Sequence, residues 1–384
     1  MTAYDVPLPA PLTALPTPAL LVDEERMTRN IADAAGRAAR TGVALRPHFK
    51  TSKCLEIARA QLAAGAIGFT CSTPAEVTAL QEAGLGDLLW AHAPVGPAKV
   101  AFAVRAAVGQ RRRTDRPESG DRPYAGDGLT VALDSTAVAV PLSEAAAAAG
   151  VILPYLIEVD TGHGRAGVPP EEVAALAAEL ARLPGLHLRG IFTHEGHLAR
   201  HVGDRAALEA AGRRAGETMA DLAAALRTAG HPCRVVSVGS TPGATSTPEV
   251  PGVTEARAGS YVFFDANQVA LGSADPERCA LTVLSRVTRV RADGTVIIDA
   301  GVKAMSSDGS VAGNGFGVVT PDIDFGTANE EHGFLTGPGT TGLRVGDLVR
   351  IVPNHVCGTV NMWSGMYLVD GETAVRRWAV VARH

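Results

Sequence analysis

Between residues 43 and 264 the chain alternates short apolar runs with alanine-rich amphipathic stretches, and this alternation constrains the fold more than any other feature. Strands that alternate with helices form parallel βαβ units. Eight such units over about 220 residues fit an α/β fold of the closed (βα)8 barrel type. An open doubly wound sheet is the alternative, but no run is followed by GxGxxG. The predicted strands lie at 43–49, 67–72, 87–92, 129–134, 154–160, 188–194, 234–240 and 255–263.

After about residue 270 the pattern changes to apolar runs joined by turns rich in Gly, Pro and Asp. We therefore expect a C-terminal all-β domain, with strands at 281–290, 295–299, 348–352 and 374–381. The run Leu20–Asp23 can add a strand to either domain. The predicted division is a barrel over 24–268 and a β domain made of 1–23 and 269–384. The polar segment 111–128 is predicted to be a long surface loop, with a lid or regulatory role as the alternative.

Composition excludes several classes of protein. The net charge of −5 gives no electrostatic case for nucleic acid. No apolar run approaches the roughly 20 residues that span a bilayer, and Met1–Pro11 shows no secretory signal. Five widely spread cysteines without a CxxC pair indicate free thiols in a reducing cytoplasm.

Lysine is scarce, and two of the four lysines lie together in RPHFKTSK at 46–53. A lysine amine can lose its proton and form a Schiff base, whereas a guanidinium cannot. Lys50 follows the first predicted strand, at the barrel end where active sites form. A solvated basic turn is the alternative interpretation. Lys53 is expected to be a charge near the mouth of the site.

Two glycine-containing turns lie at the carboxyl ends of the seventh and eighth predicted strands, at 239–243 and 259–261. In (βα)8 barrels, loops after these strands commonly bind phosphate through backbone amides. A closed barrel places them beside Lys50. An aldehyde for the lysine and a phosphate for the loops together describe pyridoxal 5′-phosphate (PLP). A phosphosugar aldolase that forms a lysine Schiff base is the competing hypothesis.

His355 and Cys357 occur in PNHVC at 353–357. If this segment is a strand, both side chains project from the same face. Imidazole and thiolate suit Zn²⁺, and two ligands leave positions open for water or substrate. A coincidental pair is the alternative.

With these motifs assembled, the chain resembles the D-serine dehydratase and D-threonine aldolase family of fold-type III PLP enzymes, whose first domain is similar to that of alanine racemase. The resemblance implies a PLP barrel, a metal-bearing β domain, a homodimer and a small D-amino acid substrate. It rests on LPTPALLVD at 15–23, RPHFKTSK at 46–53, EVDTGHGRAGV at 158–168, HEGH at 194–197, GSTP at 239–242, RAGSYVFFD at 257–265, DAGVK at 299–303 and PNHVCGTVN at 353–361.

The resemblance also implies roles for individual residues. Lys50 would form the Schiff base with PLP and act as the catalytic base, and Arg165 would lie near the phenolic oxygen of PLP. His194 is expected to contact the cofactor. For His194, as for His163 and His197, a purely structural hydrogen-bonding role is the alternative. His355 and Cys357 would hold a divalent metal, for which Zn²⁺ is preferred. The phosphate would lie against Gly239, Ser240, Thr241, Gly259, Ser260 and Tyr261.

The H-x-C spacing is similar to the dehydratase branch, whereas the aldolase branch more often carries H-x-D. We therefore expect β-elimination from a D-3-hydroxy amino acid, which yields a 2-oxo acid and ammonia. Aldolase cleavage to glycine and an aldehyde is the first alternative. An amino-acid racemase and a PLP-binding protein without catalysis are the others. Leu198-Ala199 and Gly358-Thr359 depart from the family pattern, which leaves the substrate side chain open.

Overall fold

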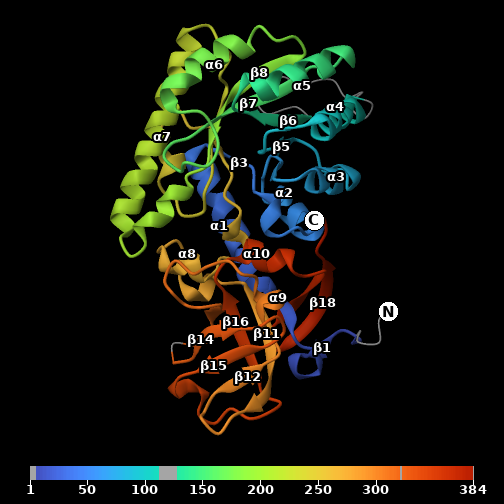
Figure 1. Cartoon of the computed structure of the whole chain (residues 1–384), viewed down its shortest axis with the longest axis vertical. Helices are drawn as coiled ribbons and strands as arrows, with labels where there is room; N and C mark the ends of the chain where they lie inside the picture. The colour runs from blue at the N-terminus through green and yellow to red at the C-terminus, as the bar shows by residue number, and fades with distance from the viewer. Residues whose placement is uncertain (1–5, 112–127, 321, 384) are drawn as a thin grey trace.

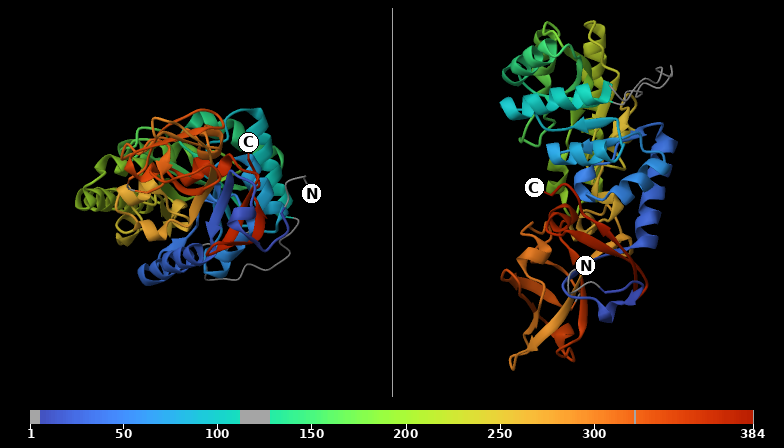
Figure 2. Two further views of the ribbon diagram at one scale, coloured as in Figure 1. Left: turned by 90° about the horizontal axis from the view of Figure 1, so that it is seen from below. Right: turned by 90° about the vertical axis from the view of Figure 1, so that its right-hand side faces the viewer.

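The computed structural model describes residues 6–111, 128–320 and 322–383. A barrel domain and an antiparallel β domain are stacked along the long axis of the molecule (Figures 1 and 2). The chain returns to the barrel at its end, and the C-terminus lies where the two domains meet (Figure 1). Nearly all of the predicted 111–128 loop lies outside the described residues.

Eight parallel strands form the barrel, in the order β3-β10-β9-β8-β7-β6-β5-β4. The amide of Thr70 donates to the carbonyl of Pro47 at 2.9 Å and completes the ring between the first and second strands. The predicted fold class is thus confirmed. The strands are β3 (Ala44–Leu45), β4 (Phe69–Cys71), β5 (Leu88–Trp90), β6 (Leu129–Leu133), β7 (Leu153–Val159), β8 (Leu186–Thr193), β9 (Val235–Val238) and β10 (Glu255–Ala256).

Helices surround the barrel and bury its outer apolar layer (Figure 1). Local signals start several of them; the Thr73 side chain, for example, caps α3 by accepting from the Glu76 amide. The helix α1 (Glu24–Thr41) precedes the first strand and packs beside β3 and the turn after β10. The others are α2 (Leu55–Ala63), α3 (Pro74–Glu82), α4 (Pro97–Arg111), α5 (Thr136–Ala148), α6 (Val173–Leu180), α7 (Arg205–Thr228) and the short α8 (Ala266–Ala270).

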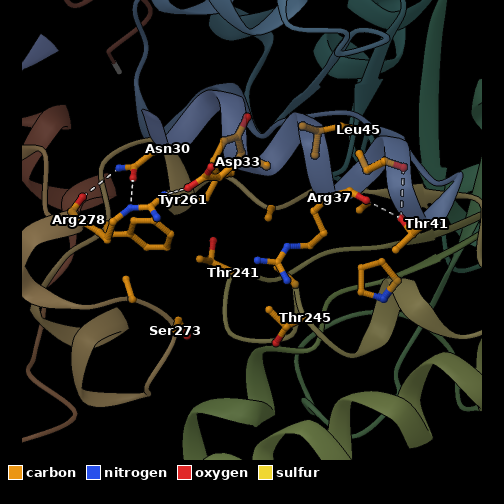
Figure 3. A pocket seen from close by; sticks show the side chains of 18 of the residues that line it. Asn30, Asp33, Arg37, Thr41, Leu45, Thr241, Thr245, Tyr261, Ser273 and Arg278 are labelled. Carbon is orange, nitrogen blue, oxygen red and sulfur yellow. Dashed lines mark hydrogen bonds and ion pairs between the residues drawn. The ribbon is translucent and has the colours of Figure 1, made fainter. Parts of the chain in front are cut away.

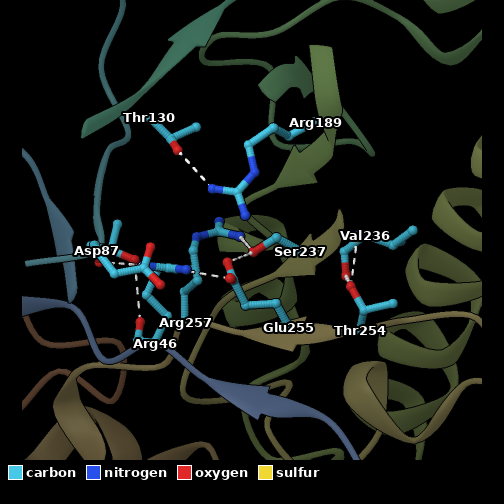
Figure 4. A network of polar contacts seen from close by, with 10 residues as sticks. Arg46, Asp87, Thr130, Arg189, Val236, Ser237, Thr254, Glu255 and Arg257 are labelled. Carbon is cyan, nitrogen blue, oxygen red and sulfur yellow. Dashed lines mark hydrogen bonds and ion pairs between the residues drawn. The ribbon is translucent and has the colours of Figure 1, made fainter. Parts of the chain in front are cut away.

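The barrel interior holds a buried polar network (Figure 4) beside a small apolar cluster formed by Leu89, Ala132, Leu156, Phe192 and Val235. Arg46 of the first-strand segment binds Glu255 of β10 at 2.8 Å and Asp87 at 3.0 Å. Ser237 of β9 donates to the second oxygen of Glu255 at 2.6 Å, and Arg257 donates to Ser237 at 2.7 Å. A buried charge requires such partners, so the network fixes how the first and last strands meet.

The second domain is a mainly antiparallel sheet in which the N-terminal strands join the C-terminal ones, with one parallel pair between β2 and β17. Leu20–Asp23 falls within β2 (Ala19–Asp23), which pairs with β11 and β17. The predicted all-β character holds except for two short helices, α9 (Val302–Met305) and α10 (Val356–Asn361). The remaining strands are β1 (Ala10–Pro11), β11 (Leu281–Val290), β12 (Val296–Ile298), β13 (Gly317–Val318), β14 (Asp324–Ala328), β15 (Gly333–Thr336), β16 (Leu348–Pro353), β17 (Gly365–Asp370) and β18 (Thr373–Ala379).

The five cysteines are all unpaired, as expected, and only Cys357 is not buried. Among the described residues, no helix combines the length and apolarity needed to cross a bilayer.

Candidate active site

A cavity of about 560 Å³ opens at the carboxyl ends of the barrel strands. Of the predicted site residues, it brings together Lys50, Arg165, His194 and Gly239. Four different strands or strand-end loops thus supply one site, as the barrel geometry requires. Further polar side chains line the same space, namely His48, Thr70, Ser72, His92, Asp134, Glu158 and Arg257.

Lys50 lies in a tight turn, Phe49–Thr51, immediately after the first strand. The ring of Phe49 is fully buried and anchors the turn. Lys53 is not a charge near the mouth, which corrects the expectation from sequence. Its amine is buried, donating to Glu76 at 2.9 Å and to the carbonyl of Ala382 at 2.7 Å. Of the lysine pair, only Lys50 lines the cavity.

Positive charge dominates this cavity, and two of its histidines, His48 and His194, are neutral at pH 7. Burial lowers the pKa of His194 to about 3, against its hydrogen bond to the Gly239 carbonyl and with the help of the Lys50 charge. Burial, followed by the charges of Lys50 and Arg257, holds the pKa of His48 well below its usual range. With Arg165 also present, the cavity suits an anionic ligand.

The Gly259 turn lies against the Lys50 turn, and Gly239 of the other glycine turn lines the same cavity as Lys50. A Cβ at Gly259 would lie 2.5 Å from Thr51 Oγ1 and 2.9 Å from His48 Cβ, so only glycine fits. A Cβ at Gly239 would lie 2.8 Å from Arg257 Cβ. A lysine amine, a cationic wall and a glycine cradle in one cavity fit PLP.

The other predicted phosphate residues do not all face this cavity. The side chains of Thr241 and Tyr261 line a separate cavity outside the barrel, and the Tyr261 hydroxyl accepts a hydrogen bond from Gln61. Ser260 lies 3.8 Å from the Cys357 sulfur. The Gly239 amide donates to the buried Glu195 carboxylate at 3.1 Å. Thr241 and Tyr261 therefore do not line the cavity that contains Lys50.

His355 and Cys357 lie side by side, but not in a strand. β16 ends at Pro353, His355 is the N-cap of α10, and Cys357 lies in its first turn. The predicted same-face strand geometry is therefore wrong. The helix begins here because Asp265, distant in sequence, accepts the Val356 amide at 3.0 Å and satisfies the helix N-terminus.

The His355–Cys357 pair has an unusual charge state. Burial alone would raise the pKa of Cys357, but the adjacent His355 charge and hydrogen bond lower it to about 7. The Cys357 charge in turn raises the pKa of His355 to about 11. The thiol lies 3.2 Å from Thr51 Oγ1, one residue from Lys50. Asp308 binds His355 Nδ1 at 2.9 Å, so Nε2 is the nitrogen that Asp308 does not engage and that could bind a metal.

A thiolate beside an oriented imidazole is a donor set that fits Zn²⁺. No group of three or more His, Cys, Asp or Glu side chains in the part of the chain that the structure describes is placed to hold a metal. The pair would therefore form an open site, completed by water or substrate, as expected from sequence.

Sequence reasoning missed several residues of the site. Arg257 and Glu158 stand inside quoted motifs, but only the fold shows that both line the cavity. Burial raises the pKa of Glu158, which the Arg165 and Arg257 charges oppose. Asp308 carried no usable signal, because nothing in its local sequence places it beside His355. His163 stacks edge-to-face on His194 at 5.5 Å, behind the residues that line the cavity.

Comparison with known proteins covers both domains. Residues 22–267 match the family described as alanine racemase, N-terminal domain, and residues 280–369 match the putative serine dehydratase domain. D-threo-3-hydroxyaspartate dehydratase of Delftia sp. strain HT23 is 36% identical, over 96% of this chain and 97% of that protein. D-threonine aldolase of Arthrobacter sp. is 33% identical, over 97% of this chain and 94% of that protein.

A solved structure supports the same relationship. The D-threo-3-hydroxyaspartate dehydratase, as a cysteine-to-alanine variant described as metal-free, superposes with a TM-score of 0.85 at 35% identity. The match covers 96% of this chain and 98% of that one.

Proposed function

Because the chain belongs to the D-serine dehydratase and D-threonine aldolase family of fold-type III PLP enzymes, we propose that it is a metal-dependent lyase acting on D-3-hydroxy amino acids. The single observation that carries the proposal is the His355–Cys357 pair, packed against the turn that bears Lys50. We propose β-elimination as the reaction, since the thiolate ligand and the 36% identical dehydratase both favour it.

Lys50 would hold PLP, with the glycine turns around the phosphate and Arg165 beside the ring. When bound, PLP supplies an electron sink that makes the Cα proton of an amino acid acidic. Nζ of Lys50 would accept that proton. The strongly lowered pKa values of His48 and His194 make these two imidazoles weaker bases. Arg165 and Arg257 keep the cavity positive and so attract the substrate carboxylate.

His355 Nε2 and Cys357 Sγ would hold the metal, for which Zn²⁺ is the preferred candidate. A bound Zn²⁺ supplies a Lewis acid that makes a β-hydroxyl a better leaving group. Asp308 orients the imidazole, which raises its basicity as a ligand. Thr51 links this pair to the Lys50 turn, so both groups would face the same amino acid.

Aldolase cleavage is the second candidate, favoured by the 33% identical D-threonine aldolase. It would use the same residues, with the β-hydroxyl losing a proton rather than leaving. A racemase or a PLP carrier would have no need for the thiolate–imidazole pair.

Product analysis with PLP- and Zn²⁺-loaded enzyme tests the proposal. With D-threonine, β-elimination yields 2-oxobutanoate and ammonia, whereas aldol cleavage yields glycine and acetaldehyde. D-threo-3-hydroxyaspartate should likewise yield a 2-oxo acid and ammonia. Lys50→Ala should lose both turnover and the visible absorbance of lysine-bound PLP.

Glycine and an aldehyde as the main products would replace dehydratase with aldolase. Conversion to the L-amino acid without β-bond cleavage would indicate a racemase. Tight PLP binding without turnover of any 3-hydroxy amino acid would leave only a carrier.

A further inference from the structure

A second cavity, of about 220 Å³, lies outside the barrel between α1 and the segments that follow β9 and β10 (Figure 3). Its floor is the outer face of the strands, formed by Leu45, Ala256 and Ala258. Their neighbours Arg46, Glu255 and Arg257 point the opposite way, into the interior network, because strand side chains alternate. The barrel wall therefore separates this cavity from the active site.

The cavity exists because small side chains meet on both of its walls. Helix α1 presents Ala34 and Ala38 to it, opposite the alanines of the strand segment. The helix that follows β10, α8, has only five residues, so no long helix fills the space over the last strand. The result is an apolar chamber at the junction of the first and last strands.

One guanidinium in this cavity has no partner. Arg37 of α1 is half-buried and extends into the space between Thr241 and Thr245 (Figure 3). Its side chain makes no hydrogen bond or ion pair with the residues that the structure describes. The other two arginines are engaged: Arg278 with Asp33 at 2.7 Å, and Arg205 with Glu209 at 3.1 Å.

Hydroxyl groups supply further polar positions. The Ser273 hydroxyl is buried and has no hydrogen-bond partner among the described residues, although it lines the cavity. Such a group is costly to leave unpaired, and a ligand oxygen would satisfy it. Thr241 and Thr245 line the same space. Asp275 adds one exposed carboxylate at the rim, which disfavours a ligand with several negative charges.

We propose that this cavity binds a small organic monocarboxylate that carries one further hydroxyl or keto oxygen. Its carboxylate pairs with Arg37, its body packs on the alanine and leucine floor, and its second oxygen bonds to a hydroxyl of the wall. Arginine is the side chain best matched to a carboxylate, through two parallel hydrogen bonds. The cavity is less than half the volume of the active site, which limits the ligand to a compact molecule.

The position of the cavity couples it to the cofactor loops. Thr241 and Tyr261 stand in the two turns expected to hold the PLP phosphate, and both line the new cavity. Arg205 also ties the first of these turns to α7 through the Pro242 carbonyl, at 3.1 Å. A ligand that orders these turns makes PLP bind more tightly, and bound PLP must then increase the affinity for the ligand by the same factor. This coupling, unlike the site itself, rests on the proposed cofactor.

Calorimetric titration of the full-length PLP-loaded protein with 4-hydroxybenzoate tests the site. We expect binding by the wild type, and at least tenfold weaker binding of the uncharged 4-hydroxybenzamide. Arg37→Gln and the cavity-filling Ala34→Leu should each weaken 4-hydroxybenzoate binding at least tenfold. Arg40→Gln, an exposed arginine on the same helix, is the matched control and should leave it unchanged.

No measurable binding to the wild type at millimolar concentration would overturn the proposal. Binding of 4-hydroxybenzoate to Arg37→Gln as tight as to the wild type would also overturn it. So would a probe that active-site ligands displace and whose affinity neither Arg37→Gln nor Ala34→Leu changes. Because the readout is binding, a protein that lacks lyase activity still gives a clear answer about this site. Titration of the PLP-free protein then measures the coupling, and equal affinity with and without PLP would refute it.

Discussion

Replacing Lys53 with methionine should destabilise the protein strongly, although Lys53 lies outside the active-site cavity. The side chain is only 4% exposed and its partner Glu76 only 1%. Methionine keeps most of the volume but removes the ammonium, so the Glu76 carboxylate would stay buried with only the Ser72 amide as a partner. Breaking a buried pair from one side costs about 3–5 kcal/mol. We expect a loss of that size in the free energy of unfolding.

The substitution should also loosen the C-terminal segment of the chain. The Lys53 amine binds the Ala382 carbonyl, and the Lys53 carbonyl accepts the Val381 amide at 2.7 Å. The C-terminal segment is thus held against the turn that carries Lys50. Because Lys53→Met removes one of these bonds, carboxypeptidase should digest the residues near 382 faster in the variant than in the wild type.

Urea denaturation followed by circular dichroism measures the effect, because urea is uncharged and does not screen ion pairs. Lys303→Met is the matched control, since Lys303 forms an exposed pair with Glu331 and should show no measurable loss. The double variant Lys53→Met with Glu76→Gln should recover much of the stability, because no charge then stays buried alone. A Lys53→Met variant no less stable than Lys303→Met would refute the reasoning, as would a double variant less stable than Lys53→Met.

Three further predictions concern the site itself. Burial lowers the pKa of His194 in the folded protein from 6.5 to about 3, so unfolding at a pH between these values takes up one proton. As the pH is lowered from 6.5 toward 3, the free energy of unfolding therefore falls by about 1.4 kcal/mol per pH unit. In urea titrations at a series of pH values, His194→Asn should lower the slope of unfolding free energy against pH by the equivalent of one proton. An unchanged slope would contradict the burial of a neutral imidazole. Gly259→Ala should weaken PLP binding at least tenfold by spectrophotometric titration, because its Cβ collides with Thr51, whereas Gly309→Ala, in open space, should bind PLP normally. Asp308→Asn should weaken Zn²⁺ binding about 10–100-fold by competition with a chelating dye, since it orients His355; equal zinc affinity would mean that the carboxylate has no such role.

The barrel and the lysine turn could be predicted because their signals are local. Strand and helix periods are written in consecutive residues, and the polar ends of parallel strands must gather at one rim. Lys50, Arg165, His194 and Gly239 therefore meet in one cavity, as their positions at or just beyond the carboxyl ends of the predicted strands required.

Other parts of the site depend on contacts between distant residues. The end of β16 before His355 is set by a cap from Asp265, which no pattern near His355 reveals. The sequence predicted that His355 and Cys357 lie side by side, which the structure confirms, but it predicted a strand where the chain forms the start of α10. Lys53 likewise looks like its neighbour Lys50 in sequence, and only the burial of Glu76 opposite it decides that it is structural.

By itself, then, the order of residues determined the parallel barrel and the all-β character of the second domain, and it singled out Lys50, the glycine turns and the H-x-C pair as candidate chemical groups. Tertiary structure decided which side of the barrel wall each side chain faces. It placed Thr241 and Tyr261 over an outer cavity and Arg257 inside the barrel mouth. The physical reason is that residue type is fixed along the chain, whereas burial, pairing and charge state depend on which distant segments pack together.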